Sequence, residues 1–136
     1  MKTLLVYYSY TGHTKKLAVE TADRESADLA EIAQEKAPDK LTAYAAGCVD
    51  AVRGKAWPIK TPPIDWKEYD RAILMAPVWA GNAPPPFRAF LDTLPGGKAV
   101  SVTMVAASGK ASCEDKLRTL IRQRGSTLTD FKVVKG

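Results

Sequence analysis

The chain contains 136 residues, of which 46% are hydrophobic and 26% are charged. These values are typical of one globular domain, so we expect a single domain over residues 1–136 whose core needs no disulfide or metal. The net charge of +5 at pH 7 is too small for a histone-like nucleic-acid binder. Two cysteines exclude a disulfide scaffold and favour a reducing, cytoplasmic setting.

Strand and helix patterns alternate from the N-terminus onward. The apolar run at 4–8 predicts a strand buried on both faces, and it is too short for a signal peptide or a membrane span. A helical stripe follows it, formed by Leu17, Ala18, Thr21 and Ala22. We expect a second strand at 28–32 and a second helix over about 40–53.

The second half of the chain continues this alternation. A third buried strand is expected at 71–76, and the prolines at 84–86 open a third helix, because proline fits a first helical turn. The apolar face of this helix comprises Phe87, Phe90, Leu91 and Leu94. After a fourth strand at 100–105, Ser112 and Asp115 predict a capping box for a fourth helix that Gly125 ends. A fifth strand is expected at 127–134.

Five strands with four intervening helices predict a mostly parallel sheet covered by helices, an α/β fold. In such sheets ligands bind beyond the carboxyl ends of the strands, where the winding direction reverses. The candidate site therefore lies in the loops that follow strands, at 9–14, 77–82 and 106–112.

The first of these loops, Ser9-Tyr10-Thr11-Gly12-His13-Thr14, joins a buried strand to a helix N-terminus. Its hydroxyls, its glycine and the positive helix end suit a phosphate group. A Walker loop needs Gly-Lys-Ser/Thr and a dinucleotide loop needs three spaced glycines, and the loop has neither pattern. The loop therefore favours a phosphate monoester held without metal, and the alternative is a polar turn that only caps the helix.

The pattern Ser-x-Thr-Gly-x-Thr after a first strand resembles the FMN phosphate loop of the flavodoxins. Residues 77–82, with the proline run after them, resemble the second flavin loop of this family, and 107–109 lie where the third would be. The resemblance implies a doubly wound five-stranded parallel sheet of order 2-1-3-4-5 with FMN at the switch point. No helix is expected after the fifth strand, so the fold would lack the usual C-terminal fifth helix.

The resemblance also implies residue roles. Hydroxyls and backbone N–H groups of the first loop would bind the FMN phosphate, Trp79 would border the flavin ring, and the Gly81 carbonyl would turn toward flavin N5. The third loop would bind the pyrimidine edge through N–H groups. The alternative for Trp79 is a cap on the sheet edge. The implied cofactor-binding residues are Ser9, Tyr10, Thr11, Gly12, His13, Thr14, Pro77, Val78, Trp79, Ala80, Gly81, Asn82, Ala107, Ser108 and Gly109.

The implied function is electron transfer through a non-covalent FMN, either as a carrier or as a small oxidoreductase; no catalytic side chain or metal ligand is expected. The donor and acceptor stay open among NAD(P)H, a quinone and a redox protein. The alternative is a flavodoxin-fold binding or regulatory domain without redox activity. A receiver domain is disfavoured, because the third strand ends in Ala76-Pro77 rather than in a phosphorylatable aspartate.

The missing fifth helix would leave part of one sheet face uncovered. Alternation in the fourth strand places Ser101 and Thr103 on one face, which we assign to the open side. The neighbouring strands would add apolar groups there: Ile73 and Met75 or Leu74, and Phe131 and Val133 or Val134. Because a bare apolar face usually marks an interface, we expect a homodimer or a docking partner across it, and no nucleic acid or membrane.

Overall fold

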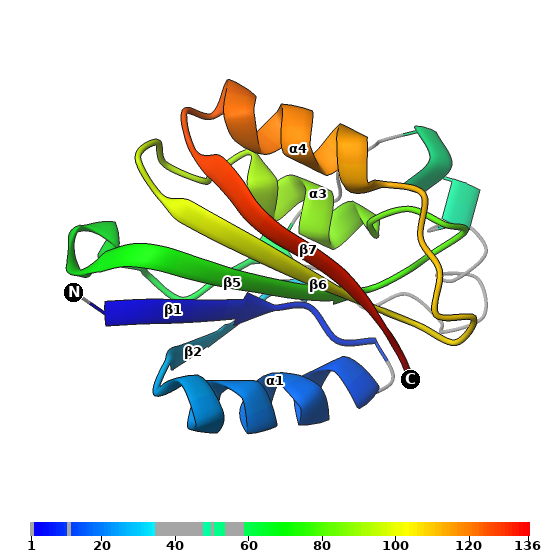
Figure 1. Cartoon of the computed structure of the whole chain (residues 1–136), viewed down its shortest axis with the longest axis horizontal. Coiled ribbons are helices and arrows are strands. Elements are labelled where there is room, and N and C mark those ends of the chain that lie inside the picture. Colours follow the sequence, from blue (N-terminus) through cyan, green and yellow to red (C-terminus); the bar gives the residue numbers. More distant parts are fainter. Residues whose placement is uncertain (1, 11, 35–47, 50, 54–58) are drawn as a thin grey trace.

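A five-stranded parallel sheet forms the centre of the chain, shown as a computed structural model in Figure 1. The structure describes residues 2–10, 12–34, 48–49, 51–53 and 59–136. The strands run in the order β2-β1-β5-β6-β7, and all four pairings are parallel. This confirms the predicted 2-1-3-4-5 sheet. The strands are β1 (Lys2–Tyr7), β2 (Asp28–Glu31), β5 (Tyr69–Pro77), β6 (Ala99–Ala106) and β7 (Thr127–Lys135).

Helices cover the sheet from both sides, as Figure 1 shows. Helix α1 (His13–Glu25) lies on one face, whereas α3 (Pro85–Leu91) and α4 (Glu114–Gln123) lie on the other. These three helices confirm the first, third and fourth predicted ones. The second predicted helix, at about 40–53, falls mostly outside the described residues, although 48–49 and 51–53 are helical.

The sheet separates two apolar clusters. The larger cluster joins the sheet to α3 and α4, and it includes the buried Phe87, Phe90 and Leu117. The smaller one joins Ile73 and Met75 of β5, with other residues, to α1. All four residues of the expected apolar face of α3 are buried, although α3 ends at Leu91 and Leu94 lies in the segment after it.

Two local features differ from expectation. The capping box is wrong: Cys113 is the N-cap residue of α4, without a side-chain cap, and Ser112 Oγ donates instead to the carbonyl of Gly81 at 3.1 Å. The Ser112 hydroxyl is therefore hydrogen-bonded to the loop that contains Gly81 and does not cap α4. The second feature went unpredicted. It comprises a two-stranded antiparallel ladder, β3 (Ala33–Gln34) with β4 (Ile59–Lys60), and a short 3-10 helix, η1 (Trp66–Glu68).

The sheet face beside α1 is not the bare apolar surface that we expected. Ser101 and Thr103 do face this side, as assigned, but Ile73 and Met75 are only 4% and 2% exposed. A register shift between β6 and β7 turns Phe131 and Val133 toward the opposite cluster. The β7 residues on the α1 side are Asp130, Lys132 and Val134. Ile73, Met75 and Val134 do lie on this side, as named among the alternatives, but polar residues of β6 and β7 stand among them, so the face is not a bare apolar surface. The homodimer or docking partner stays a prediction.

In the described part of the chain, no helix combines the length and the apolar character that crossing a membrane requires.

Two buried tyrosines near β2 are hydrogen-bonded to carboxylates. The Tyr7 hydroxyl donates to Glu31 Oε2 at 2.8 Å, and the Tyr69 hydroxyl donates to Asp28 Oδ2 at 2.7 Å. Burial, together with Glu31, raises the pKa of Tyr7 to about 12. The hydrogen bond to Asp28, with burial, raises the pKa of Tyr69 to about 12.

These shifts predict a loss of stability in alkali. Because each phenol binds its proton more tightly in the folded chain, its contribution is complete below a pH of about 10 and is lost as the pH rises toward 12. Urea unfolding should therefore give a free energy that falls steeply over this range. Replacing both residues (Tyr7→Phe with Tyr69→Phe) should make the fall shallower. An unchanged slope would contradict this assignment.

Candidate functional site at the carboxyl edge

Three loops meet at the carboxyl edge of the sheet, and backbone hydrogen bonds hold them together. The N–H of Tyr8, at the end of β1, donates to the carbonyl of Met75 in β5 at 3.0 Å. The N–H of Val78 donates to the carbonyl of Val105 in β6 at 2.9 Å. The predicted loops after β1, β5 and β6 are therefore neighbours in space.

In the first loop, the Ser9 hydroxyl gathers two backbone donors. Ser9 Oγ accepts from the N–H of Gly12 at 3.1 Å and from the N–H of Lys15 at 3.2 Å. Gly12 is the N-cap residue of α1 and has a φ of 98°, which favours glycine. A Cβ built on Gly12 would meet no atom within 4 Å, so the space above the loop is open.

The other predicted residues of this loop differ in exposure. His13 is exposed at the first turn of α1, whereas Thr14 is only 2% exposed. Thr11 lies outside the described residues. The helix start, two converging N–H groups and the open space above Gly12 form an arrangement in which an anionic oxygen is stabilised.

The second loop is a tight two-residue turn. Trp79 and Asn82 exchange two backbone hydrogen bonds of 2.9 Å, and Ala80 and Gly81 between them have φ angles of 50° and 79°. Positive φ at both central residues is the mark of a type I′ turn. The amide of Asn82 adds a bond to the carbonyl of Ala80 at 3.0 Å.

The turn is fastened to the segment that precedes α4. The Gly81 carbonyl accepts from both the N–H of Ser112, at 2.8 Å, and the Ser112 hydroxyl, at 3.1 Å. Any turn of this carbonyl toward a flavin, as the family resemblance implies, has to break both hydrogen bonds. Sequence reasoning missed Ser112 in this role, because it read the residue as a local helix cap.

Three aromatic rings lie between the first and second loops. Trp79 is 2% exposed and makes edge-to-face contacts with Tyr8, at a centroid distance of 5.9 Å, and with Tyr10, at 5.2 Å. Such geometry is favourable for aromatic pairs. Tyr10 is the half-buried member of the cluster. Stacking of a flavin on the face of Trp79 therefore requires the surroundings of Trp79 to open.

Tyr8 is a second residue that the sequence analysis missed. Its side chain is 3% exposed, and its hydroxyl has no hydrogen-bond partner among the residues that the structure describes. Burial raises the pKa of this phenol well above its usual value, with Tyr10 adding to the shift. An unsatisfied buried hydroxyl costs free energy, and it is the kind of group that a bound ligand can satisfy.

The third loop is an exposed turn. The N–H of Gly109 donates to the carbonyl of Ala106 at 3.0 Å, with Gly109 at a φ of 73°. Ala107 and Ser108 are exposed at its tip, and Ser108 Oγ accepts from the N–H of Lys110 at 3.3 Å. The turn presents backbone rather than large side chains to the carboxyl edge.

Neither cysteine chemistry nor a metal cluster is found at this edge among the described residues. Cys113 is 1% exposed, and burial raises the pKa of its thiol, so it packs in the core rather than acting as a nucleophile. No group of three or more His, Cys, Asp or Glu side chains in the described ranges could hold a metal ion.

A matched pair of glycine substitutions tests whether Ser112 restrains the turn at residues 79–82. Gly81 and Gly97 have nearly equal φ angles, 79° and 80°, but a Cβ on Gly81 would lie 2.9 Å from Ser112 Oγ, whereas one on Gly97 would meet nothing within 4 Å. Both alanine variants should lose roughly 1–2 kcal/mol of stability to left-handed strain. Gly81→Ala should lose measurably more in urea unfolding, because Ser112 must shift. Equal losses would show that the Ser112 contact does not restrain the turn.

No protein-family model matches the sequence, and no curated protein matches it. Solved structures do. A flavoprotein from Lactobacillus acidophilus in complex with FMN has a TM-score of 0.78 at 22% identity, covering 97% of this chain and 92% of the other. The apo-form of the flavoprotein from Lactobacillus acidophilus has a TM-score of 0.72 at 23% identity, covering 96% and 91%.

A third match is more distant. The flavodoxin of Streptococcus pneumoniae TIGR4 has a TM-score of 0.59 at 18% identity, covering all of this chain and 87% of the other. At these identities the likeness concerns the course of the backbone. Together with the strand order and the helices on both faces, it shows that the chain has the flavodoxin-like fold.

Proposed function

We propose that the chain binds FMN non-covalently at the carboxyl edge and exchanges electrons through it, as a carrier or as a small NAD(P)H- or quinone-type oxidoreductase. The observation that carries the proposal is the meeting of three loops beyond β1, β5 and β6, where the winding direction of the sheet reverses. The likeness to a flavoprotein crystallised with FMN supports it.

The first loop fits the phosphate of FMN. The N–H groups of Gly12 and Lys15 point at one oxygen, that of Ser9, and the space above Gly12 is open. A phosphate oxygen can share these donors, while the Ser9 hydroxyl keeps its own proton to donate. The exposed side chains of Lys15 and Lys16 add positive charge to the helix end.

The second and third loops fit the edges of a planar ring. The exposed tip of the 106–109 turn can offer backbone N–H groups, and the half-buried Tyr10 gives an aromatic surface beside the first loop. The unsatisfied Tyr8 hydroxyl belongs to the residue that directly follows β1.

When bound, FMN would supply the chemistry, accepting and donating one or two electrons. The chain would bind it, orient it between the loops and exclude water from one side of its ring. No described side chain is assigned as an acid or a base. Because the chain carries +5, a bound phosphate dianion would leave it at about +3. A positively charged protein should hold a reduced flavin at a less negative potential than an acidic one.

The visible spectrum of the purified protein tests the proposal. We expect flavin absorption after addition of FMN and gel filtration. Anaerobic NADH and NADPH then separate the two forms of the function: rapid bleaching identifies an oxidoreductase, and bleaching only with a partner reductase identifies a carrier. A colourless protein that does not retain FMN would point instead to a binding or regulatory domain without redox activity.

The phosphate loop gives a substitution with a built-in control. Thr11→Ala combined with Thr14→Ala should remove two charge-assisted hydrogen bonds to the phosphate, each worth roughly 1.5–3 kcal/mol, and weaken FMN binding on the order of a hundredfold or more. Riboflavin lacks the phosphate, so it should bind the variant and the parent chain equally. Titration by flavin fluorescence measures both. Unchanged FMN affinity would place the phosphate elsewhere.

A further inference from the structure

Half of one sheet face has no helix over it among the described residues. Parallel sheets are normally covered on both faces. On the α1 side, α1 packs against β2, β1 and β5, and β6 and β7 lie beside it without a helix of their own (Figure 1). The opposite face is covered by α3 and α4.

This uncovered half forms a groove between α1 and β7. Two adjoining cavities, of about 180 Å³ and about 460 Å³, share Leu17 and Val134 in their linings. They extend along α1 from Arg24 at its end to Gly12 at its start. Because α1 has 13 residues, the groove is roughly 20 Å long. That length suits three to four turns of a helix.

The floor of the groove is partly apolar and partly hydroxylic. Met75 and Val105 contribute buried apolar surface, and Thr103, 7% exposed, contributes a hydroxyl. On the α1 wall, Thr21 is 5% exposed, and within the described part of the chain its hydroxyl has no hydrogen-bond partner. The lining of the groove is therefore mixed, with apolar side chains and hydroxyl groups side by side.

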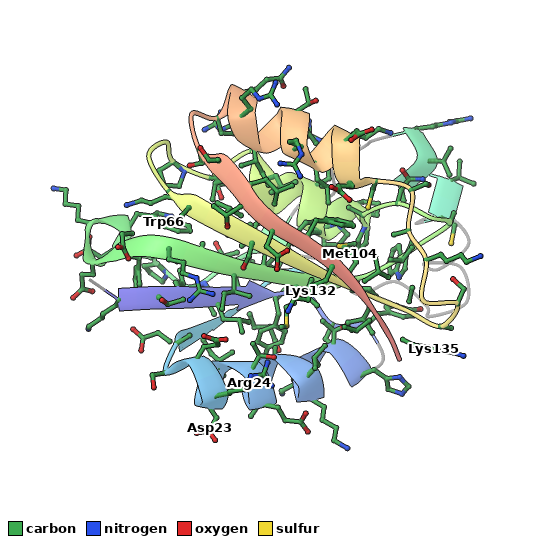
Figure 2. All side chains as sticks on the ribbon, in the orientation of Figure 1. Asp23, Arg24, Trp66, Met104, Lys132 and Lys135 are labelled. Atoms are coloured by element: carbon green, nitrogen blue, oxygen red, sulfur yellow. The ribbon has the colours of Figure 1, made fainter. Side chains whose placement is uncertain are left out.

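The rims of the groove carry more cations than anions. Lys16 and Arg24 stand on α1, and Lys132 and Lys135 stand on β7; Figure 2 labels the last three on the same face of the molecule. None of these four forms an ion pair within the described ranges, whereas Arg71 is paired with Glu25 at 3.7 Å. The carboxylates in the lining are Glu20, Glu25 and Asp130.

We propose that this groove binds an acidic amphipathic helix of a partner protein. Its apolar side would cover the floor between α1 and β7, as helices cover the opposite face of the sheet. Its carboxylates would meet the four unpaired rim cations. A second copy of the chain is the less suitable occupant, because a symmetric contact would bring this cationic rim against itself. The proposal does not depend on FMN binding.

A pair of labelled peptides tests the proposal on the full chain. The probe is a fluorescein-labelled 14-residue helical peptide with leucine and alanine on one face and glutamate on the other; its control carries lysine in place of glutamate. Fluorescence anisotropy should show binding of the acidic peptide at least about tenfold tighter than the basic one, weakening with salt. Amide shifts in ¹⁵N spectra should map to α1, β6 and β7 and spare α3.

Charge reversal distinguishes the groove from a general attraction to a basic protein. Arg24→Glu with Lys132→Glu should weaken acidic-peptide binding about tenfold or more. The matched control, Lys116→Glu with Arg122→Glu, makes the same change in net charge on α4, on the other face, and should leave binding nearly unchanged. Neutral variants, Arg24→Gln with Lys132→Gln, serve if the reversed chain does not fold by circular dichroism.

Three results would overturn the proposal. The first is equal binding of both peptides, and the second is an equal effect of both charge reversals. The third is a dimer in sedimentation velocity that the Arg24 and Lys132 variants dissociate, because this would identify a second copy as the occupant.

Discussion

The parallel pairing of β1 with β5 is the contact on which the rest of the structure depends. Because β1 is paired with β2 on its other side, the chain must reverse its winding direction there. The reversal sends α1 to one face and α3 and α4 to the other, since crossovers between parallel strands are right-handed. The loops after β1 and β5 begin side by side but lead to helices on opposite faces of the sheet. Such a reversal leaves a crevice between them at the carboxyl edge, where a ligand can bind.

Hydrogen bonds between distant segments then fix the shape of this edge. The Ser112 bonds to the Gly81 carbonyl tie the second loop to the start of α4, and the Ser9 hydroxyl fixes the first loop. The turn keeps Ala80 at a positive φ, which an alanine rarely adopts, so the surrounding bonds must offset the strain. An edge that is already ordered in this way would lose less entropy on binding a ligand than a mobile one.

The periodicity of the sequence predicts the five strands of the sheet and three helices, because continuous apolar runs and helical stripes follow from burial. The strand order is implied by the family resemblance instead. Periodicity does not predict what depends on distant partners. Ser112 has the spacing of a cap, yet it bonds to Gly81. The register shift beside Val100 reverses the side on which Phe131 lies, and alternation alone cannot show such a shift. The burial of Trp79 against Tyr8 likewise appears only once the loops are assembled.

The groove and the carboxyl edge share one element, the start of α1. Gly12 and His13 line the end of the groove and also belong to the loop that we propose for the phosphate. A helix bound along α1 would therefore end beside that loop. Contact between a partner and the cofactor site then requires no change in the fold. The order of the strands already places the start of α1 next to both sites.

An NMR titration of the ¹⁵N-labelled chain with FMN tests the central claim most directly, because it reports which loops the ligand contacts. We expect the largest amide shifts in three separate segments, 9–15, 78–82 and 106–112, with little change at the opposite edge of the sheet. Shifts confined to one of these segments, or centred on the α1 groove, would contradict a flavin site built from three loops. So would the absence of any shift at saturating FMN.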